Sequence, residues 1–154
     1  MSAGERTMPR FTAGLVQLTS GPEIAANLAM AGDLVRQAAS AGADVVATPE
    51  NTPILEPDHA RLTAVIPTEA DHPALPAFAD LARELGIWLL LGSTAVRLSD
   101  AEAEDANGDG GRLANRSYLF APDGRIAARY DKIHMFDVAV PDGQTYRESQ
   151  TFRP

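Results

Sequence analysis

The sequence predicts an α/β fold in which the first strands lie parallel to one another. Short apolar segments alternate with segments whose apolar residues recur every three or four positions, which gives the order strand, helix, strand, helix, strand over residues 11–91. The turn signature Pro-Asp-Gly at residues 122–124 separates two further apolar segments and predicts an antiparallel hairpin. With 154 residues, of which 45% are hydrophobic and 22% charged, the chain can bury a core of this kind.

The first strand and the first helix have clear signals in the sequence. Residues 11–18 form the predicted strand, and Ser20-Gly21-Pro22-Glu23 has the pattern of a capping box with an early proline, so a helix is expected to begin there. The apolar positions that follow fall on one helical face: Ile24, Leu28, Ala31, Val35 and Ala38. Gly42 is expected to end this helix.

The next strand is expected over residues 43–48, because the proline that follows disfavours helix and ends the strand. Glu50 therefore lies just past the carboxyl end of a short buried strand. Residues 51–71 contain three prolines and are expected to form a loop. A second helix is expected over residues 73–85, and a strand buried on both faces over residues 87–91.

The remaining segments are predicted from composition and turn signals. Residues 98–112 are acidic and rich in glycine, which is typical of a surface loop. The two strands of the hairpin are expected over residues 113–120 and 125–130. Residues 131–154 show little periodicity and are expected to form a long irregular arm. Residues 1–10 are expected to be a flexible N-terminus.

Composition excludes several classes of function. Thirteen Lys and Arg against 21 Asp and Glu give a net charge of −8 with no basic cluster, so neither a nucleic acid nor a membrane is an expected partner. The most apolar run is five residues long, and no signal peptide is visible, so a cytoplasmic location is expected. The sequence contains no cysteine, which excludes disulfides, thiolate metal sites and a cysteine nucleophile within these 154 residues.

Neither a metal nor an organic cofactor is expected. Residues 105–110 match the first six positions of a calcium-binding loop, but the twelfth position holds Arg116, whose charge would repel the ion. We therefore interpret this segment as solvated loop. His134 has no ligand spacing with His59 or His72, so a histidine metal site is not predicted.

Three ionisable residues follow predicted strands or turns. Glu50 stands where α/β folds place their active sites. Lys132 lies in residues 130–137, directly after the hairpin. Glu148 lies in residues 141–149, which are expected to form a turn followed by an extended piece. Each has an ordinary structural interpretation when taken alone: a loop carboxylate, a lysine whose stem packs on the surface, and one of 21 acids.

Taken together and in this order, these segments resemble the carbon–nitrogen hydrolase, or nitrilase, superfamily, from about residue 11 to residue 154. Pro49-Glu50-Asn51 resembles the family's Pro-Glu motif. Lys-x-His-x-Phe-Asp from Lys132, followed by Pro-x-Gly and by Tyr-x-Glu-Ser around Glu148, is similar to the Nit-type amidase branch. The sequence departs from that branch mildly, with Asp142 where glycine is usual and Met135 where leucine is usual.

The resemblance implies both a function and a fold. The function is hydrolysis of a non-peptide carbon–nitrogen bond, in the amide of a small carboxylic acid, of ω-amidase or deaminated-glutathione amidase type. Glu50 is implied to be the general base, Lys132 the charge beside the oxyanion, and Glu148 the residue that holds Lys132. The implied fold is the amino-terminal portion of an α-β-β-α sandwich, so residues 1–154 are interpreted as one incomplete domain. The family also implies a homo-oligomer in the full-length form and a small-molecule amide as partner.

The family's nucleophile is a cysteine that is implied to lie beyond this chain, so the chain alone is predicted to be inactive. Ser20, Ser93 and Ser149 lack the strand-to-helix turn and nearby base that a serine nucleophile needs. A second chain that supplies the cysteine is one alternative, and a catalytically inactive binding or interaction module is another. An unrelated flavodoxin-like domain is disfavoured by the hairpin and by the segment around Lys132. Half a sandwich is also expected to expose the inner face of its sheet.

Overall fold

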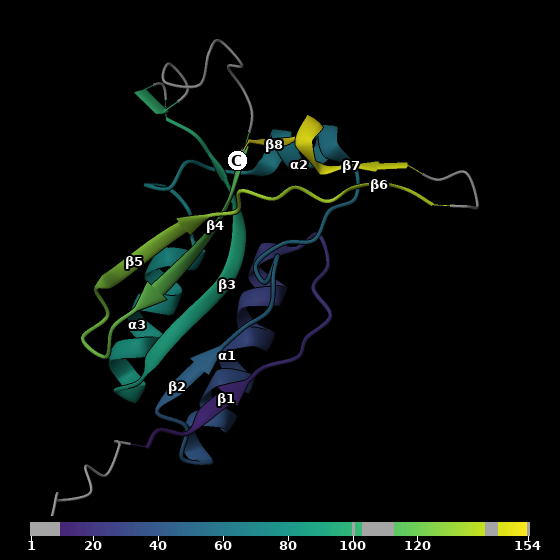
Figure 1. The fold of residues 1–154 in the computed structure, drawn as a ribbon. Helices are drawn as coiled ribbons and strands as arrows, with labels where there is room; N and C mark the ends of the chain where they lie inside the picture. The colour runs from purple at the N-terminus through teal and green to yellow at the C-terminus, as the bar shows by residue number, and fades with distance from the viewer. Residues whose placement is uncertain (1–9, 100, 103–112, 141–144, 154) are drawn as a thin grey trace, which may run out of the picture.

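A computed structural model describes residues 10–99, 101–102, 113–140 and 145–153 of the chain. The elements, in chain order, are β1 (Ala13–Leu15), α1 (Ile24–Ser40), β2 (Val45–Ala47), α2 (His59–Val65), α3 (Ala74–Leu85), β3 (Trp88–Arg97), β4 (Leu113–Phe120), β5 (Ile126–Asp131), β6 (Asp137–Ala139), β7 (Thr145–Arg147), a 3-10 helix (Glu148–Gln150) and β8 (Phe152–Arg153). In Figure 1, α1 and α3 lie behind the sheet and the β6–β7 hairpin projects from one end of it. None of the described helices is long and apolar enough to cross a membrane.

The central sheet has the strand order β1-β2-β3-β4-β5, and β8 pairs with the first residues of β4. β1, β2 and β3 are parallel neighbours, whereas β4 runs antiparallel to both β3 and β5. This order confirms the predicted α/β class and the hairpin at residues 122–124, where Gly124 takes a φ of +83°. Residues 1–9 of the predicted flexible N-terminus (residues 1–10), the calcium-like segment 105–110 and most of the loop 98–112 lie outside the described residues.

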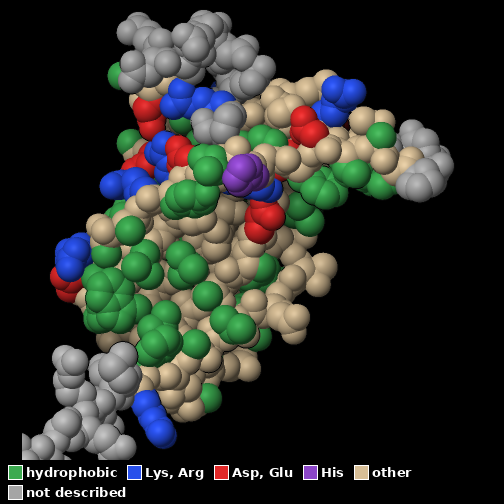
Figure 2. Space-filling view, in the orientation of Figure 1, with side chains coloured by type: hydrophobic (Ala, Val, Ile, Leu, Met, Phe, Trp, Pro, Cys, Tyr) green, Lys and Arg blue, Asp and Glu red, His purple; other side chains and the backbone are tan. Residues whose placement is uncertain are grey.

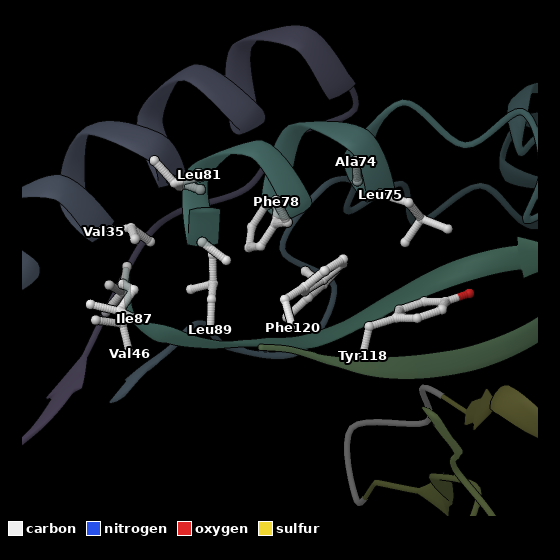
Figure 3. Packing of buried hydrophobic residues seen from close by; sticks show 14 of the residues in the cluster. Val35, Val46, Ala74, Leu75, Phe78, Leu81, Ile87, Leu89, Tyr118 and Phe120 are labelled. Atoms are coloured by element: carbon white, nitrogen blue, oxygen red, sulfur yellow. The ribbon is translucent and has the colours of Figure 1, made fainter. Parts of the chain in front are cut away.

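The main core lies between one face of the sheet and the helices α1 and α3 (Figure 3). Val46 of β2, Leu89 of β3 and Phe120 of β4 meet Val35 of α1 and Phe78 of α3 there. The rings of Phe78 and Phe120 lie 6.2 Å apart in a tilted arrangement. None of the five side chains is more than 2% exposed, and burial of each contributes roughly 1.5–3 kcal/mol. This packing fixes the sheet that carries the polar residues described below.

The predicted capping box at residues 20–23 is wrong. Helix α1 begins directly after Glu23, which makes no side-chain capping bond. Ser20 instead donates a hydrogen bond from Oγ to the carbonyl of Thr52, at 2.8 Å. The turn before the helix is held by the buried amide of Asn27, which bonds one N–H and one carbonyl of that turn at 3.0 and 2.7 Å. The hydroxyl of Ser20 therefore bonds the loop after β2 and does not cap the helix.

Three other segments differ from the expectations. Residues 51–71 are not all loop, because Asp58 caps the short helix α2 by accepting two backbone N–H bonds. The strand expected over residues 87–91 continues to the end of β3, and Trp88 at its start is 37% exposed rather than buried. Residues 131–154 contain β6, β7, the 3-10 helix and β8, which are too short to show a sequence period.

The opposite face of the sheet is apolar, and no described helix covers it. The strand register places these side chains on it: Ala13, Leu15, Val45, Ala47, Trp88, Leu90, Leu119, Ala128 and Tyr130. Leu15 is 80% exposed and Tyr130 56%. Figure 2 shows hydrophobic side chains across the face of the molecule that is turned away from α1 and α3. A continuous apolar surface of this kind is typical of a contact face.

Because this face has no cover, we expect the 154-residue chain to self-associate. Leu15 lies in β1, the strand at the edge of this apolar face. Leu15→Lys puts a charge there and is expected to shift the sedimentation coefficient of the chain toward that of a monomer. Met30→Lys is the matched control, since Met30 is a partly exposed apolar residue of α1, on the other side of the sheet. A wild-type chain that sediments as a monomer and melts cooperatively would contradict this expectation.

A buried histidine joins the start of α3 to β3. His72 is 1% exposed, and its Nδ1 accepts a hydrogen bond from the N–H of Ala74 at 3.2 Å. The ring proton therefore resides on Nε2, which donates to Thr94 Oγ1 at 3.0 Å, and that hydroxyl in turn donates to the carbonyl of Ala95. This chain of bonds requires a neutral ring. Burial lowers the pKa of His72 below its ordinary value.

The lowered pKa of His72 makes stability depend on pH in a defined direction. In the unfolded chain the ring takes up a proton near pH 6.5, whereas the folded chain resists protonation until lower pH, so acid favours unfolding across this window. We expect the melting temperature to fall between pH 7 and pH 5, and to fall less in His72→Gln. The exposed His134 provides the control, because His134→Gln should leave the pH dependence unchanged. Equal pH dependence in the wild type and in His72→Gln would disprove this role.

Candidate active site

Four polar side chains converge at one edge of the sheet. Glu50 follows β2, Lys132 follows β5, Asn115 is the third residue of β4, and Glu148 begins the 3-10 helix after β7. Because β4 runs antiparallel to β3 and β5, its first residues lie at the same edge as the last residues of β2 and β5. The topology therefore gathers residues that are distant in the sequence.

The loop that carries Glu50 crosses β3 at Gly92, where the two backbones come very close. A Cβ at this position would lie 2.1 Å from the carbonyl oxygen of Thr48 and 2.5 Å from that of Pro49. Only glycine permits this approach. The N–H of Gly92 also donates to Thr48 Oγ1 at 3.2 Å. The crossing fixes the backbone just before Glu50.

The backbone just after Glu50 is fixed as well. Asn51 takes a φ of +56°, a left-handed conformation that asparagine adopts more readily than most residues. Ser93 of β3 then accepts two hydrogen bonds from the loop, one from the N–H of Asn51 to Oγ at 3.1 Å and one from the N–H of Thr52 to its carbonyl at 3.2 Å. Glu50 is thus presented from a turn that is anchored on both sides.

Lys132 lies between two glutamates. Its Nζ is 2.9 Å from Glu50 Oε1, and 3.0 and 2.8 Å from Oε1 and Oε2 of Glu148. The structure therefore brings together all three residues that the sequence motifs singled out. Partial burial acts against the positive charge, but hydrogen bonds to Glu148 and Glu50 outweigh it and raise the pKa of Lys132.

Both carboxylate oxygens of Glu148 are engaged. Oε1 accepts from Lys132 and, at 3.4 Å, from Asn115 Nδ2, while Oε2 accepts from the N–H of Phe136 at 2.6 Å. Burial acts to raise the pKa of Glu148, but the hydrogen bonds from Lys132 and from the Phe136 backbone prevail and lower it. Glu148 is held as an anion and has no oxygen left over for proton transfer.

Glu50 differs from Glu148 in a way that matters for chemistry. Its Oε1 accepts from Lys132 and, at 2.8 Å, from Asn115 Nδ2. In the part of the chain that the structure describes, its Oε2 has no hydrogen-bond partner. The side chain is 52% exposed and lines a cleft of about 690 Å³. One oxygen is fixed and the other is available, which suits a carboxylate that takes up a proton.

The cleft combines this charged group with an apolar wall. Its lining includes Leu62 of α2 and Phe152 of β8, together with Phe136 and Tyr146, whose rings lie 6.2 Å apart. Polar side chains of the lining include His59 and Arg147. A concave apolar site with a few convergent charges is typical of a small-molecule pocket.

Asn115 was not among the predicted site residues. It is 1% exposed, and its Nδ2 reaches both glutamates. In the sequence it is a single polar residue within the apolar strand over residues 113–120, a signal too weak to mark a site. Its role becomes visible only once strand pairing places it beside the loop of Glu50.

The neighbouring residue Arg116 points to the other side of β4 and belongs to a separate group of charges. Its guanidinium makes ion pairs of 2.7, 2.9 and 2.6 Å with Glu69, Glu102 and Asp131. These bonds join β4 to β5 and to segments before and after β3. Within the described ranges, no group of three or more acidic or histidine side chains is arranged to hold a metal ion.

The chain is similar to known proteins in its sequence and in its fold. The model of the carbon–nitrogen hydrolase family matches residues 12–154, and the chain belongs to this family. It is 33% identical over 146 residues to a deaminated glutathione amidase of Synechocystis, covering 94% of this chain and 49% of that protein. It is also 33% identical over 149 residues to an omega-amidase of Xenopus tropicalis, covering 96% and 49%.

The solved structures give the fold. The amidase from Nesterenkonia sp. AN1, a member of the nitrilase superfamily, is similar with a TM-score of 0.70 at 21% identity. The match covers 94% of this chain and 50% of that one. The present chain therefore has an α/β fold that corresponds to about half of a nitrilase-superfamily structure, and it spans about half the length of the curated relatives it matches.

The contacts of Lys132 lead to a direct prediction. In Glu148→Gln the ammonium loses one of its two anionic partners, so the pKa of Lys132 is expected to fall toward its ordinary value. NMR titration of the Lys132 side chain measures this change. Glu84→Gln, which alters an exposed carboxylate of α3 paired with Arg36, should have no effect. An unchanged Lys132 titration in Glu148→Gln would refute the electrostatic coupling.

Proposed function

We propose that this chain supplies the acid–base and electrostatic half of an amidase site that hydrolyses the amide of a small carboxylic acid. The observation that carries the proposal is the position of Lys132 between a fully bonded Glu148 and a Glu50 whose Oε2 has no partner among the described residues. The names of the curated relatives, a deaminated glutathione amidase and an omega-amidase, support the amide of a small carboxylic acid as the substrate.

The proposed chemistry uses a thiol from outside these 154 residues. The Nesterenkonia relative has an active-site cysteine to which acrylamide adds, which supports a thiol nucleophile here. Glu50 Oε2 takes the proton of the thiol as its sulfur forms a bond to the amide carbon. The carbonyl oxygen becomes an oxyanion, and the ammonium of Lys132 provides fixed positive charge beside it.

Glu50 then returns the proton to the amide nitrogen, and ammonia leaves as the thioester forms. A water molecule next gives a proton to Glu50 and attacks the thioester carbon. The carbon–sulfur bond breaks, the carboxylic acid leaves, and Glu50 returns the proton to the sulfur, which restores the thiol and the carboxylate. Glu148 accepts no proton in this scheme. Its charge offsets the cost of keeping Lys132 ionised in a partly buried position, and it holds the ammonium in place.

Complementation tests this function. The chain is co-expressed with the carboxyl-terminal half of the Synechocystis relative, and ammonia release is measured from small amides such as succinamic acid. We expect turnover only when both halves are present, and a loss of roughly 100-fold or more in Glu50→Gln, because removing a general base costs about that much. Glu84→Gln serves as the control carboxylate and should retain activity.

Acrylamide labelling of the added cysteine separates failure of assembly from failure of the proposal. If the two halves co-purify and the cysteine is alkylated but no amide is hydrolysed, the chain is better described as a binding or interaction module. If restored turnover survives Glu50→Gln, the role given to Glu50 is wrong.

A further inference from the structure

We propose that Asn115 is a positioning residue that holds the two carboxylates in fixed places on either side of Lys132. The inference rests on the proposed function, because it identifies Asn115 as the residue that keeps the general base, Glu50, apart from the anion, Glu148. Asn115 contacts both glutamates from its position in β4 and not from the cleft.

The contacts of Asn115 account for the geometry of the whole group. Its Nδ2 donates to Glu50 Oε1 at 2.8 Å and lies 3.4 Å from Glu148 Oε1. Lys132 Nζ bonds the same two oxygens at 2.9 and 3.0 Å. Each of these oxygens is therefore held by two donors, one a mobile ammonium and the other a rigid amide in a paired strand. The amide defines where the oxygens sit, and the ammonium adapts to them.

The backbone of Asn115 takes part as well. Its carbonyl accepts a hydrogen bond from the N–H of Lys132 at 2.9 Å, so one residue sets the position of the lysine backbone and of both carboxylates. The next residue, Arg116, binds Asp131 from the other side of the sheet, and Asp131 directly precedes Lys132. Two consecutive residues of β4 thus anchor the end of β5 from opposite faces.

The orientation of the amide is defined by charge. Two carboxylate oxygens can only accept hydrogen bonds, so the amide nitrogen must face them and the amide oxygen must point away. That oxygen, Asn115 Oδ1, is buried and has no partner among the described residues. A buried acceptor without a donor is destabilising. The oxygen is left unpaired because Nδ2 lies between Glu50 and Glu148, so the contacts with the carboxylates decide how the amide is turned.

The test begins with the 154-residue chain and does not need turnover. Asn115→Leu removes both donors at nearly constant volume, and Asn115→Asp keeps the shape but turns the donor into an anion. NMR titration of the Glu148 carboxyl is expected to shift to higher pH in both variants, and further in Asn115→Asp, since a second negative charge then faces it. Ser117→Ala is the matched control, because Ser117 lies on the same strand and face but bonds the carbonyl of Gly92.

A second readout uses the complemented enzyme. Loss of positioning is expected to lower kcat about tenfold or more while KM changes little, since substrate contacts remain but the base is misplaced. A folded Asn115→Leu or Asn115→Asp chain with an unmoved Glu148 titration overturns the proposal. An Asn115 variant whose kcat is unchanged also overturns the proposal. If complementation gives no amidase, the titration still decides the role of Asn115, so the failures of the two proposals are distinguishable.

Discussion

The site depends on a single positive charge held between two negative ones. Without Lys132, Glu50 and Glu148 would be two carboxylates sharing the donor of Asn115 in a partly buried place, and their repulsion would favour protonating one of them. With Lys132 present, each carboxylate has a cationic partner, and the ion pair lowers the pKa of Glu148 and raises that of Lys132. The three charges therefore depend on one another, and removing any one of them changes the environment of the other two.

The rest of the described fold serves to place this unit. The packing of α1 and α3 holds one face of the sheet, and the antiparallel pairing of β4 with β3 brings the start of β4 beside the loop after β2. Gly92 then lets the loop of Glu50 cross β3 at a distance that no other residue allows. The order of the strands thereby places Lys132 within hydrogen-bond distance of Glu50 and Glu148.

The sequence predicted the parts of this arrangement that have a local signal. The helical faces and the hairpin follow from periodicity and turn chemistry, and Glu50 follows from a proline placed after an apolar strand. Asn115 has no such signal, because an asparagine in a strand is informative only when its partners across the sheet are known. The strands β6, β7 and β8 are set by tertiary contacts, since two or three residues cannot show a period of two.

The two faces of the sheet explain why the site is only partly enclosed. One face is packed to near-complete burial, while the other is apolar and open, and Glu50 stands beside the open face with half of its side chain exposed. In water, a general base and a cation at this exposure are screened and weakened. Full catalytic strength needs a cover that excludes water. In our proposal the thiol comes from outside these 154 residues, and the chain spans about half the length of the relatives it matches. A segment that packed on the apolar face would exclude water beside Glu50 and so strengthen the interaction between Lys132 and the carboxylates.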